Sequence, residues 1–331
     1  MSNSTQINED ISAKGFSIEP MKQGYGRGLV EAGKLYENVV AASSDVTGST
    51  GTEPFAQAFP ERFFEVGIAE QNLVAVGSGL AAMGKMPFVA AYGAFSPGRN
   101  WEQIKTTICI NNRPVKLIAT HVGISDAPDG ATHQMLEDIA LMRVLPNMTV
   151  VAPCDSLEAA KATIALASYN KPAYLRIARD DTTVITTEKT PFEIGDAYVY
   201  RRGADISLIA TGRMTRYALI AAEQLYKDGI HAEVIHVPTI KPLDNETILR
   251  SVAATRHVVT AEEAQINGGL GAAVAELLGE NLPTPMIRIG VRDRFGESGH
   301  PDELLKHFGL TPHHIAMAAH HLLMDHSKHK H

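Results

Sequence analysis

The sequence predicts an α/β protein with two doubly wound domains, and three observations lead to this expectation. Apolar runs alternate with amphipathic ones along most of the chain, as they do where helices cover a mostly parallel sheet. A polar, threonine-rich passage at 180–190 interrupts the alternation, which then restarts. A chain of 331 residues is also long for one core, and its 44% of hydrophobic residues can fill two.

The first predicted domain, residues 21–190, contains strand-like apolar runs separated by helical ones. The predicted strands are 38–43, 87–92, 115–120, 149–153 and 173–177. Apolar residues recur at helical spacing in 69–83, 101–110, 135–143 and 156–168. This order predicts a mostly parallel sheet with helices on both faces.

The second predicted domain, residues 191–325, repeats the pattern in a smaller unit. The predicted strands are 206–211, 232–237, 257–260 and 286–289. The predicted helices are 216–227, 245–254, 271–278 and 301–308. We interpret residues 1–20 as a flexible N-terminal segment and 326–331 as a tag-like tail, although its histidines leave a metal site as the alternative.

Composition narrows the classes of function. The formal net charge is −7 and there is no basic block, which argues against binding nucleic acid or an anionic membrane. A local group of cations can still bind an anionic ligand. The polar N-terminus is neither a signal peptide nor an anchor, and no apolar run is long enough to span a membrane. Cys109 and Cys154 lie in apolar stretches without metal-ligand spacing, so we expect a reducing, cytoplasmic location.

Polar residues gather in three segments that follow predicted strands, at 43–50, 92–99 and 120–133. Ligands of open α/β sheets bind at the carboxyl ends of the strands, so these segments are the expected site. Glu70 is a fourth feature, because it stands where a strongly apolar helix begins. The alternative for Glu70 is an acid that favours the helix dipole and faces water.

With these residues in view, the chain resembles the transketolase family. The stretch 61–179 is similar to the pyrimidine-binding domain of transketolases, and Gly296-Glu-Ser-Gly299 is similar to a short sequence near the end of their C-terminal domain. Each motif is weak alone, but together they occur in the order and spacing of the family. They are Glu70, Phe95, Asp129-Gly-Ala-Thr-His133 and Leu175-Arg-Ile-Ala-Arg179.

The resemblance implies thiamine diphosphate as cofactor. Glu70 falls on the glutamate that hydrogen-bonds N1′ of the aminopyrimidine, which favours the imino tautomer that removes the thiazolium C2 proton. Phe95 falls on the aromatic residue that stacks on the pyrimidine, the alternative being an ordinary core phenylalanine. Asp45 matches an aspartate near the cofactor and the subunit contact, with a turn-forming role as the alternative. Where the family has further aromatic residues on this side of the pyrimidine pocket, this chain has Pro97 and Gly98.

The same resemblance implies a sugar phosphate as substrate. Ser49, His121 and Arg179 fall on positions that hold the phosphate, for which Arg offers a planar donor fork. Lys22 stands near a position where the family usually has another arginine, and lysine keeps the charge but loses the bidentate geometry.

Asp129 and His133 match the pair that recognises the hydroxyls of a ketose donor. One side chain accepts a hydrogen bond and the other can donate or accept, so a hydroxyl can be oriented and assisted in proton transfer. The alternative for His133 is a histidine that bonds locally at a helix start, and a lone His121 after a strand is equally unremarkable.

A family feature is absent from the sequence. Thiamine-diphosphate enzymes hold the diphosphate through a divalent metal at a Gly-Asp-Gly segment followed by a downstream Asn, and no Gly-Asp-Gly occurs here. We expect a separate subunit to bind the diphosphate and its Mg²⁺ or Ca²⁺, in a heterotetramer of two chains of each kind. In the second domain the Gly268-Gly-Leu-Gly271 run is either a phosphate cradle or a structural turn, and we assign no catalytic residue there.

The leading hypothesis is therefore the C-terminal subunit of a split transketolase. Two other enzyme types remain open, the β-type subunit of a 2-oxo-acid dehydrogenase and a deoxyxylulose-phosphate synthase-like enzyme. The sugar-recognising set of His121, Asp129, His133 and Arg179 favours ketol transfer, because a decarboxylase of small 2-oxo acids does not need it. A non-catalytic paralogue is the fourth possibility. Against it, a buried Glu70 without a ligand would cost stability.

Overall fold

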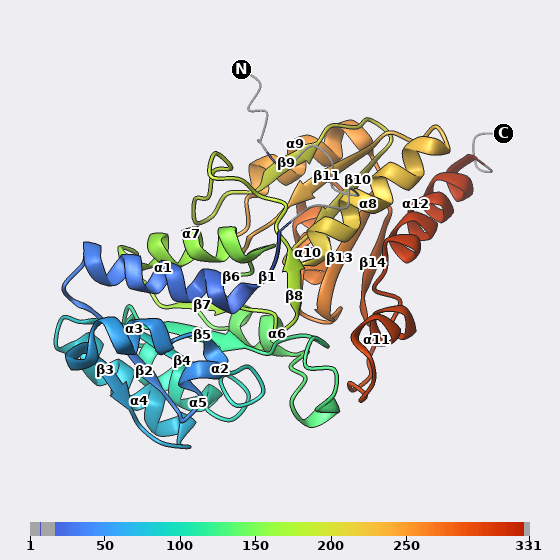
Figure 1. Ribbon diagram of the computed structural model, residues 1–331. Helices are drawn as coiled ribbons and strands as arrows, with labels where there is room; N and C mark the ends of the chain where they lie inside the picture. Colours follow the sequence, from blue (N-terminus) through green and yellow to red (C-terminus); the bar gives the residue numbers. More distant parts are fainter. Residues whose placement is uncertain (1–6, 8–16, 328–331) are drawn as a thin grey trace.

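The computed structural model describes residue 7 and residues 17–327, and the chain forms two α/β units (Figure 1). Each unit has a central, mainly parallel sheet with helices on both faces. The predicted fold class is confirmed.

The first sheet has seven strands in the order β12-β6-β7-β5-β4-β2-β3. Its strands are β2 (Val39–Ser43), β3 (Phe63–Glu65), β4 (Met86–Tyr92), β5 (Lys116–Thr120), β6 (Thr149–Val151), β7 (Ala173–Arg176) and β12 (Thr239–Lys241). All neighbours are parallel except β12, which runs antiparallel to β6. The five predicted strands are present, whereas β3 and β12 were not predicted.

Helices cover both faces of this sheet. One core lies beneath α1 (Met21–Leu35), α3 (Glu53–Ala58) and α7 (Ser156–Ala167). The opposite core lies beneath α4 (Glu70–Ala82), the π-helical segment η2 (Ile104–Cys109) and α6 (Asp138–Arg143). The short elements are α2 (Thr47–Thr50), η1 (Pro60–Arg62), α5 (Trp101–Gln103) and η3 (Gly130–Thr132).

Helix α1 was not predicted, because four glycines weaken the helical signal of its sequence. The structure gives a physical reason for two of them. A Cβ at Gly24 would lie 1.7 Å from the Ser156 carbonyl oxygen, and one at Gly28 would lie 2.6 Å from that of Ala160. These glycines let α1 lie directly along α7, as Figure 1 shows.

The second sheet has the order β14-β13-β10-β11-β9, with only β9 antiparallel. Its strands are β9 (Tyr198–Arg201), β10 (Ile206–Ala210), β11 (Ala232–His236), β13 (Val258–Gln265) and β14 (Met286–Val291). Its helices are α8 (Met214–Lys227), α9 (Asn245–Thr255), α10 (Leu270–Asn281), α11 (Pro301–His307) and α12 (Pro312–Ser327). The four predicted helices are confirmed, whereas α12 and β9 are additional.

The units are joined by more than the chain connection. Strand β12 belongs to the second half of the sequence but extends the first sheet. Arg176 on β7 forms an ion pair of 2.7 Å with Asp138 and donates to the Glu263 carbonyl of β13 at 2.7 Å. The pairing of β12 and the bond from Arg176 to Glu263 cross the boundary between the units, whereas the ion pair with Asp138 lies within the first unit.

The described residues of the segments expected to be irregular contain regular elements, and residues 1–6 and 8–16 of the predicted flexible segment lie outside the described residues. Strand β1 (Ile18–Pro20) pairs antiparallel with β8 (Asp181–Thr183), so the flexible segment and the linker each contribute a strand. At the other end, α12 includes His326 and Ser327, and the rest of the predicted tail lies outside the described residues. Among the described residues, no helix has both the length and the apolar character needed to cross a membrane.

Candidate functional site

Most of the predicted site residues follow four neighbouring parallel strands, β7-β5-β4-β2, whereas Glu70 follows β3 and Lys22 lies in α1. Because parallel strands present their carboxyl ends at one edge of the sheet, the segments after them meet there. The residues that follow these strands include Asp45, Phe95, His121 and Arg179. The sheet topology therefore places the predicted residues along one edge.

Glu70 is the first residue of α4, and its side chain is only 4% exposed. The alternative of a water-facing helix acid was therefore wrong. Arg99 Nη1 donates to Glu70 Oε2 at 2.6 Å, and the Arg99 side chain is 49% exposed. The guanidinium carbon also lies 4.7 Å from the centre of the Phe95 ring. One cation thus contacts both residues that the sequence assigns to the pyrimidine.

The backbone around this pair is held by Asn100, which is buried. Its Nδ2 donates to the Glu70 carbonyl at 2.8 Å and to Ser96 Oγ at 3.1 Å. Phe95 packs against Tyr92, with ring centres 6.2 Å apart, and against the edge of His133 at 5.4 Å. Phe95 is nevertheless half-buried, so it is not an ordinary core residue.

His121 is buried, stacks on Tyr92 at 3.9 Å and has φ of +60°. Burial is the main reason that the pKa of His121 falls to about 4, and the charges of Arg179 and Lys22 lower it further, while Asp129 opposes them. The imidazole is therefore neutral at pH 7. The charges of Arg179, Lys22 and Asp129 therefore act on the His121 ring.

Asp126 belongs to this group, although nothing in the sequence beyond its place in the loop indicated it. Its side chain is fully buried and forms an ion pair of 3.2 Å with Arg179. Burial is the largest cause of the raised pKa of Asp126, with Asp129 adding to it and Arg179 opposing it. Arg179 therefore contacts a buried carboxylate while its own side chain is 40% exposed.

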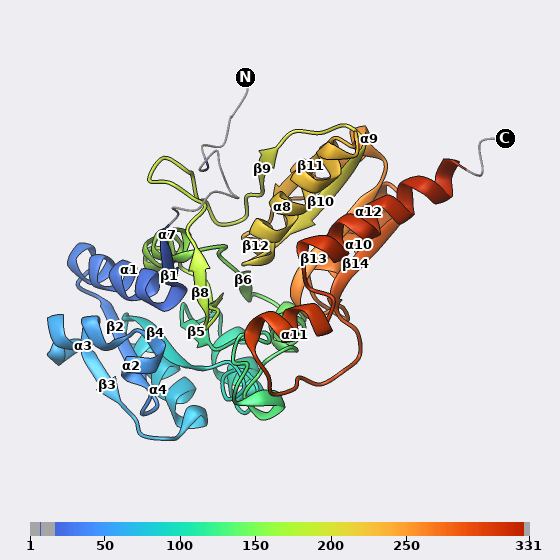
Figure 2. The same ribbon diagram turned by 45° about the vertical axis from the view of Figure 1, so that its right-hand side comes forward.

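Asp129 is exposed and His133 is half-buried, both in the loop that contains η3. The second unit supports this loop. The Gly299 amide donates to the Ala127 carbonyl at 3.1 Å, and Gln134 Nε2 donates to that of Glu297 at 2.9 Å. The 296–299 segment, singled out by resemblance, thus packs against the loop of the site, and Figure 2 shows α11 above this region.

Asp45 is exposed and adopts a left-handed conformation with φ of +61°. Its amide donates to Glu65 Oε1 at 2.7 Å, and Thr47 donates to the other oxygen of Glu65 at 3.1 Å. Glu65, which the sequence did not indicate, therefore shapes this turn. Lys22 Nζ approaches the Gly48 carbonyl at 3.5 Å, and Ser49 is half-buried on the same short helix, α2.

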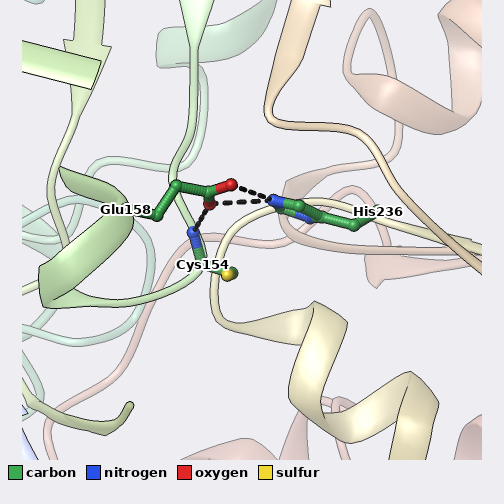
Figure 3. Close-up of side chains that lie close together, drawn as sticks. All are labelled: Cys154, Glu158 and His236. Carbon is green, nitrogen blue, oxygen red and sulfur yellow. Dashed lines mark hydrogen bonds and ion pairs between the residues drawn. The ribbon is translucent and has the colours of Figure 1, made fainter. Parts of the chain in front are cut away.

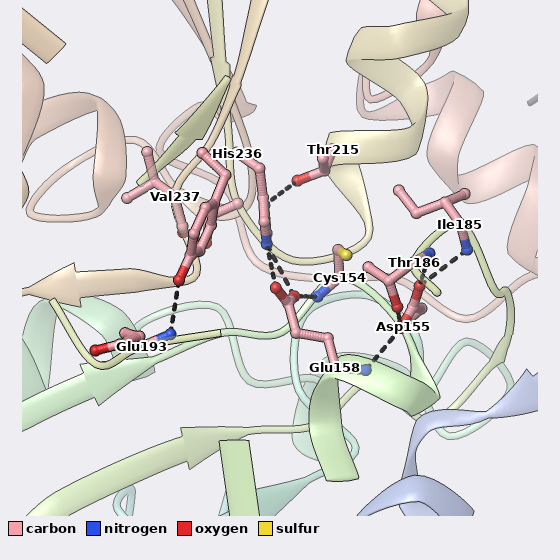
Figure 4. Close-up of polar contacts among 11 residues, drawn as sticks. Cys154, Asp155, Glu158, Ile185, Thr186, Glu193, Thr215, His236 and Val237 are labelled. Atoms are coloured by element: carbon pink, nitrogen blue, oxygen red, sulfur yellow. Dashed lines mark hydrogen bonds and ion pairs between the residues drawn. The ribbon is translucent and has the colours of Figure 1, made fainter. Parts of the chain in front are cut away.

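A second polar cluster lies between the two units (Figure 3). Glu158 on α7 accepts hydrogen bonds from the Cys154 amide at 2.7 Å and from His236 Nε2 at 2.8 Å. The other ring nitrogen of His236 bonds to Thr215 at 2.7 Å. Figure 4 shows that Asp155 extends this network to the backbone amides of Ile185 and Thr186, which follow β8; the Ile185 amide donates at 2.8 Å.

Cys154, Glu158 and His236 could serve as metal ligands, since their ligand atoms lie within 4.8 Å of one another. The expectation that neither cysteine has metal-ligand spacing was therefore incomplete, because His236 comes from a distant strand. The 2.8 Å between Nε2 and Oε2 is a hydrogen-bond length. Two ligands on a tetrahedral zinc ion would lie about 3.3 Å apart. We interpret the cluster as a hydrogen-bonded joint between the units.

The glycine run of the second unit forms a structural turn. Glu262 accepts from the amides of Leu270 at 2.7 Å and Gly271 at 2.8 Å, where α10 begins. These are the donors that a phosphate would have needed. Burial is the main cause of the raised pKa of Glu262, about 7, and the two amides oppose it. The phosphate-cradle alternative is therefore not supported.

Comparisons with known proteins place the chain in a family. Residues 20–184 match the transketolase, pyrimidine binding domain, and residues 195–315 match the transketolase, C-terminal domain. A putative transketolase C-terminal section from Methanocaldococcus jannaschii is 46% identical over 89% of this chain and 94% of its own length. The 6-deoxy-6-sulfo-D-fructose transketolase subunit of Clostridium sp. (strain MSTE9) is 42% identical over 88% of this chain and 91% of its own.

A solved structure gives the same result. It is described as a split gene transketolase, inactive beta4 tetramer, and superposes with a TM-score of 0.87 at 41% identity. The match covers 92% of this chain and 99% of that one. This chain therefore belongs to the transketolase family and contains its pyrimidine-binding and C-terminal domains.

Proposed function

We propose that the chain is the C-terminal subunit of a split, thiamine-diphosphate-dependent transketolase. In this proposal it transfers a two-carbon ketol unit from a ketose phosphate to an aldose phosphate. A separate subunit holds the diphosphate and its Mg²⁺ or Ca²⁺, in an assembly of two chains of each kind. The observation that carries the proposal is a buried carboxylate, Glu70, beside a half-buried aromatic ring, Phe95, at the edge where the sugar-recognising residues meet.

The residues present fit the pyrimidine end of the cofactor. A planar nitrogen donor can reach the Glu70 carboxylate, because Arg99 Nη1 already donates to Glu70 Oε2 at 2.6 Å. Phe95 offers an aromatic surface, which the guanidinium contacts. When bound, the cofactor supplies the nucleophilic carbon that takes the two-carbon unit. The role of Glu70 is to bond the pyrimidine nitrogen and share its proton, and Asp45 lies at the margin of the cofactor and subunit contact.

The substrate is held by the remaining residues. Arg179, braced by Asp126, supplies the main cation for the phosphate, with Lys22 and Ser49 as further donors. Because His121 is neutral at pH 7, it contributes as a neutral donor or acceptor and adds no charge. Asp129 and His133 orient the hydroxyls of the ketose and move a proton there.

Reconstitution tests this function. The chain is co-produced with a protein that carries Gly-Asp-Gly and a downstream Asn, and is given xylulose 5-phosphate and ribose 5-phosphate. We expect formation of a seven-carbon ketose phosphate that requires both chains, thiamine diphosphate and a divalent metal. Glu70→Gln should leave assembly intact and abolish transfer. Equal turnover by that variant would refute the role of Glu70.

The alternative enzymes give different outcomes in the same system. A 2-oxo-acid dehydrogenase subunit would support decarboxylation of pyruvate without any sugar. A deoxyxylulose-phosphate synthase-like enzyme would condense pyruvate with glyceraldehyde 3-phosphate. Either activity, with no ketol transfer, would replace the present proposal. Absence of every activity from an assembly that binds cofactor would indicate a non-catalytic paralogue.

A further inference from the structure

Arg99 stands where two cofactor-binding roles meet. Its guanidinium donates to the Glu70 carboxylate at 2.6 Å, and its central carbon lies 4.7 Å from the Phe95 ring centre. A guanidinium is planar, presents N–H groups at its edge and stacks on aromatic faces. An aminopyrimidine ring is likewise planar and stacks on aromatic faces, and it presents N–H groups at its amino substituent and at N1′ when that nitrogen shares the proton of Glu70. The side chain thus makes the two contacts that the proposed function assigns to the cofactor.

We propose that Arg99 is an internal substitute for the aminopyrimidine, which competes with the cofactor for Glu70 and Phe95 and so sets the affinity for thiamine diphosphate. This inference rests on the proposed function, because that function places the pyrimidine between these two residues. The Arg99 side chain has to leave Glu70 and Phe95 before the cofactor can bind.

The burial of Glu70 explains why a substitute is useful. The Glu70 side chain is 4% exposed, so its carboxylate needs a hydrogen-bonding partner, which is Arg99 or the water or ligand that takes its place. Arg99 supplies that partner from a side chain that is 49% exposed. The carboxylate is thereby satisfied before the cofactor arrives, and the chain can fold with its site intact.

The surrounding contacts show which part has to move. Asn100, the next residue, is anchored to the Glu70 carbonyl at 2.8 Å and to Ser96 Oγ at 3.1 Å. The backbone beside Arg99 is therefore held, while the long side chain reaches solvent. Rotation of an exposed side chain takes picoseconds to nanoseconds, so displacement needs no loop opening.

Displacement is also required by the chemistry of the site. An arginine does not lose its proton at accessible pH. As long as Arg99 occupies the Glu70 carboxylate, Glu70 therefore cannot exchange a proton with the pyrimidine nitrogen. Once the cofactor displaces it, the Arg99 guanidinium can turn toward solvent, where it is well hydrated.

Cofactor affinity measured on the reconstituted pair tests the inference, with Mg²⁺ saturating and thiamine diphosphate titrated by calorimetry. Arg99→Ala removes the competitor, and we expect binding to become roughly threefold to tenfold tighter, the range of a weak, half-exposed ion pair. Arg99→Lys keeps the charge but loses the planar guanidinium, so its affinity for thiamine diphosphate should lie between those of the wild type and Arg99→Ala. Phe95→Leu is the matched control that should weaken binding.

A double substitution shows whether the effect passes through Glu70. In a Glu70→Gln background the carboxylate is gone, so adding Arg99→Ala should change the affinity by less than about twofold. A crystal structure of the loaded pair should also show Arg99 out of contact with Glu70. Weaker binding by Arg99→Ala would mean a direct cofactor contact and overturn the inference, as would unchanged binding.

These outcomes separate the two levels of the proposal. If the wild-type pair does not bind thiamine diphosphate, the proposed function itself fails. If it binds and transfers ketol units but Arg99→Ala does not tighten binding, only the competition by Arg99 is refuted.

Discussion

Among the buried carboxylates of the described residues that have cationic or imidazole partners, Glu158 and Glu70 differ in how those partners are enclosed. Glu158 and His236 are 1% and 0% exposed, and each is bonded on more than one side. Glu70 is almost as buried, but its partner Arg99 is half exposed. The first pair is closed within the joint between the units, whereas the second is open to the edge of the sheet.

The difference distinguishes a structural contact from a binding site. A closed pair is costly to break because no water or ligand can replace the lost partner. An open pair can exchange its partner, and exchange is what a ligand site needs. Burial of the carboxylate alone would have ranked the two pairs together.

The largest expected effect comes from breaking the closed pair. Glu158→Ala leaves His236 and the Cys154 amide without their acceptor in the interior. We expect the free energy of unfolding to fall by about 3–5 kcal/mol, as measured by urea denaturation. Glu246→Ala is the control, because that residue is 89% exposed in its pair with Arg250 and should change nothing measurable.

Two further observations would sharpen this result. Because the pair joins α7 to β11, the unfolding of Glu158→Ala should lose cooperativity between the two units. Added zinc should not raise the stability of the wild type. If zinc did so through Cys154 and His236, the cluster would be a metal site and the interpretation as a joint would be wrong.

A pH dependence is the next effect in size, and it arises in the open region. His121 has a folded-state pKa of about 4, below its usual 6.5. Between these values the unfolded chain binds more protons, so stability falls as the pH drops from about 6.5 toward 4 and is fully present above that window. Compared with His121→Gln, the wild type should lose about 3 kcal/mol at most across it.

The measurement is the difference in unfolding free energy between wild type and His121→Gln from pH 7 to pH 4.5. Taking the difference removes the groups that titrate in both proteins. A difference that stayed constant over this range would mean that His121 is not desolvated, and the closed packing against Tyr92 would be contradicted.

Much of the fold followed from apolar periodicity, and the exceptions have physical reasons. Helix α1 was hidden by glycines that its packing on α7 demands. Strand β12 is three residues long and joins a sheet from which it is far removed in sequence. Neither local propensity nor a short pattern carries such information.

The candidate site was predictable mainly through the resemblance to the family. Glu70 stood out as an acid at the start of an apolar helix and His121 as part of a polar segment after a predicted strand, but their roles came from the resemblance and stay predictions. Asp126 and Arg99 were missed, because their importance lies in what they contact. The pairing of Arg99 with Glu70 spans 29 residues and depends on how the β4 loop turns back over α4. Only a three-dimensional arrangement reveals it.

The smallest expected effect is the one that most directly tests the comparison. Arg99→Ala breaks a contact of 2.6 Å, as short as the 2.8 Å contact between Glu158 and His236, yet we expect it to lower the free energy of unfolding by no more than about 1 kcal/mol. Water can enter the space that the half-exposed side chain leaves and hydrate the carboxylate. A loss of more than about 3 kcal/mol in urea denaturation would instead class Arg99 with His236, as a partner that cannot be exchanged. The distinction between a closed joint and an open site would then fail at the residue on which the cofactor competition depends.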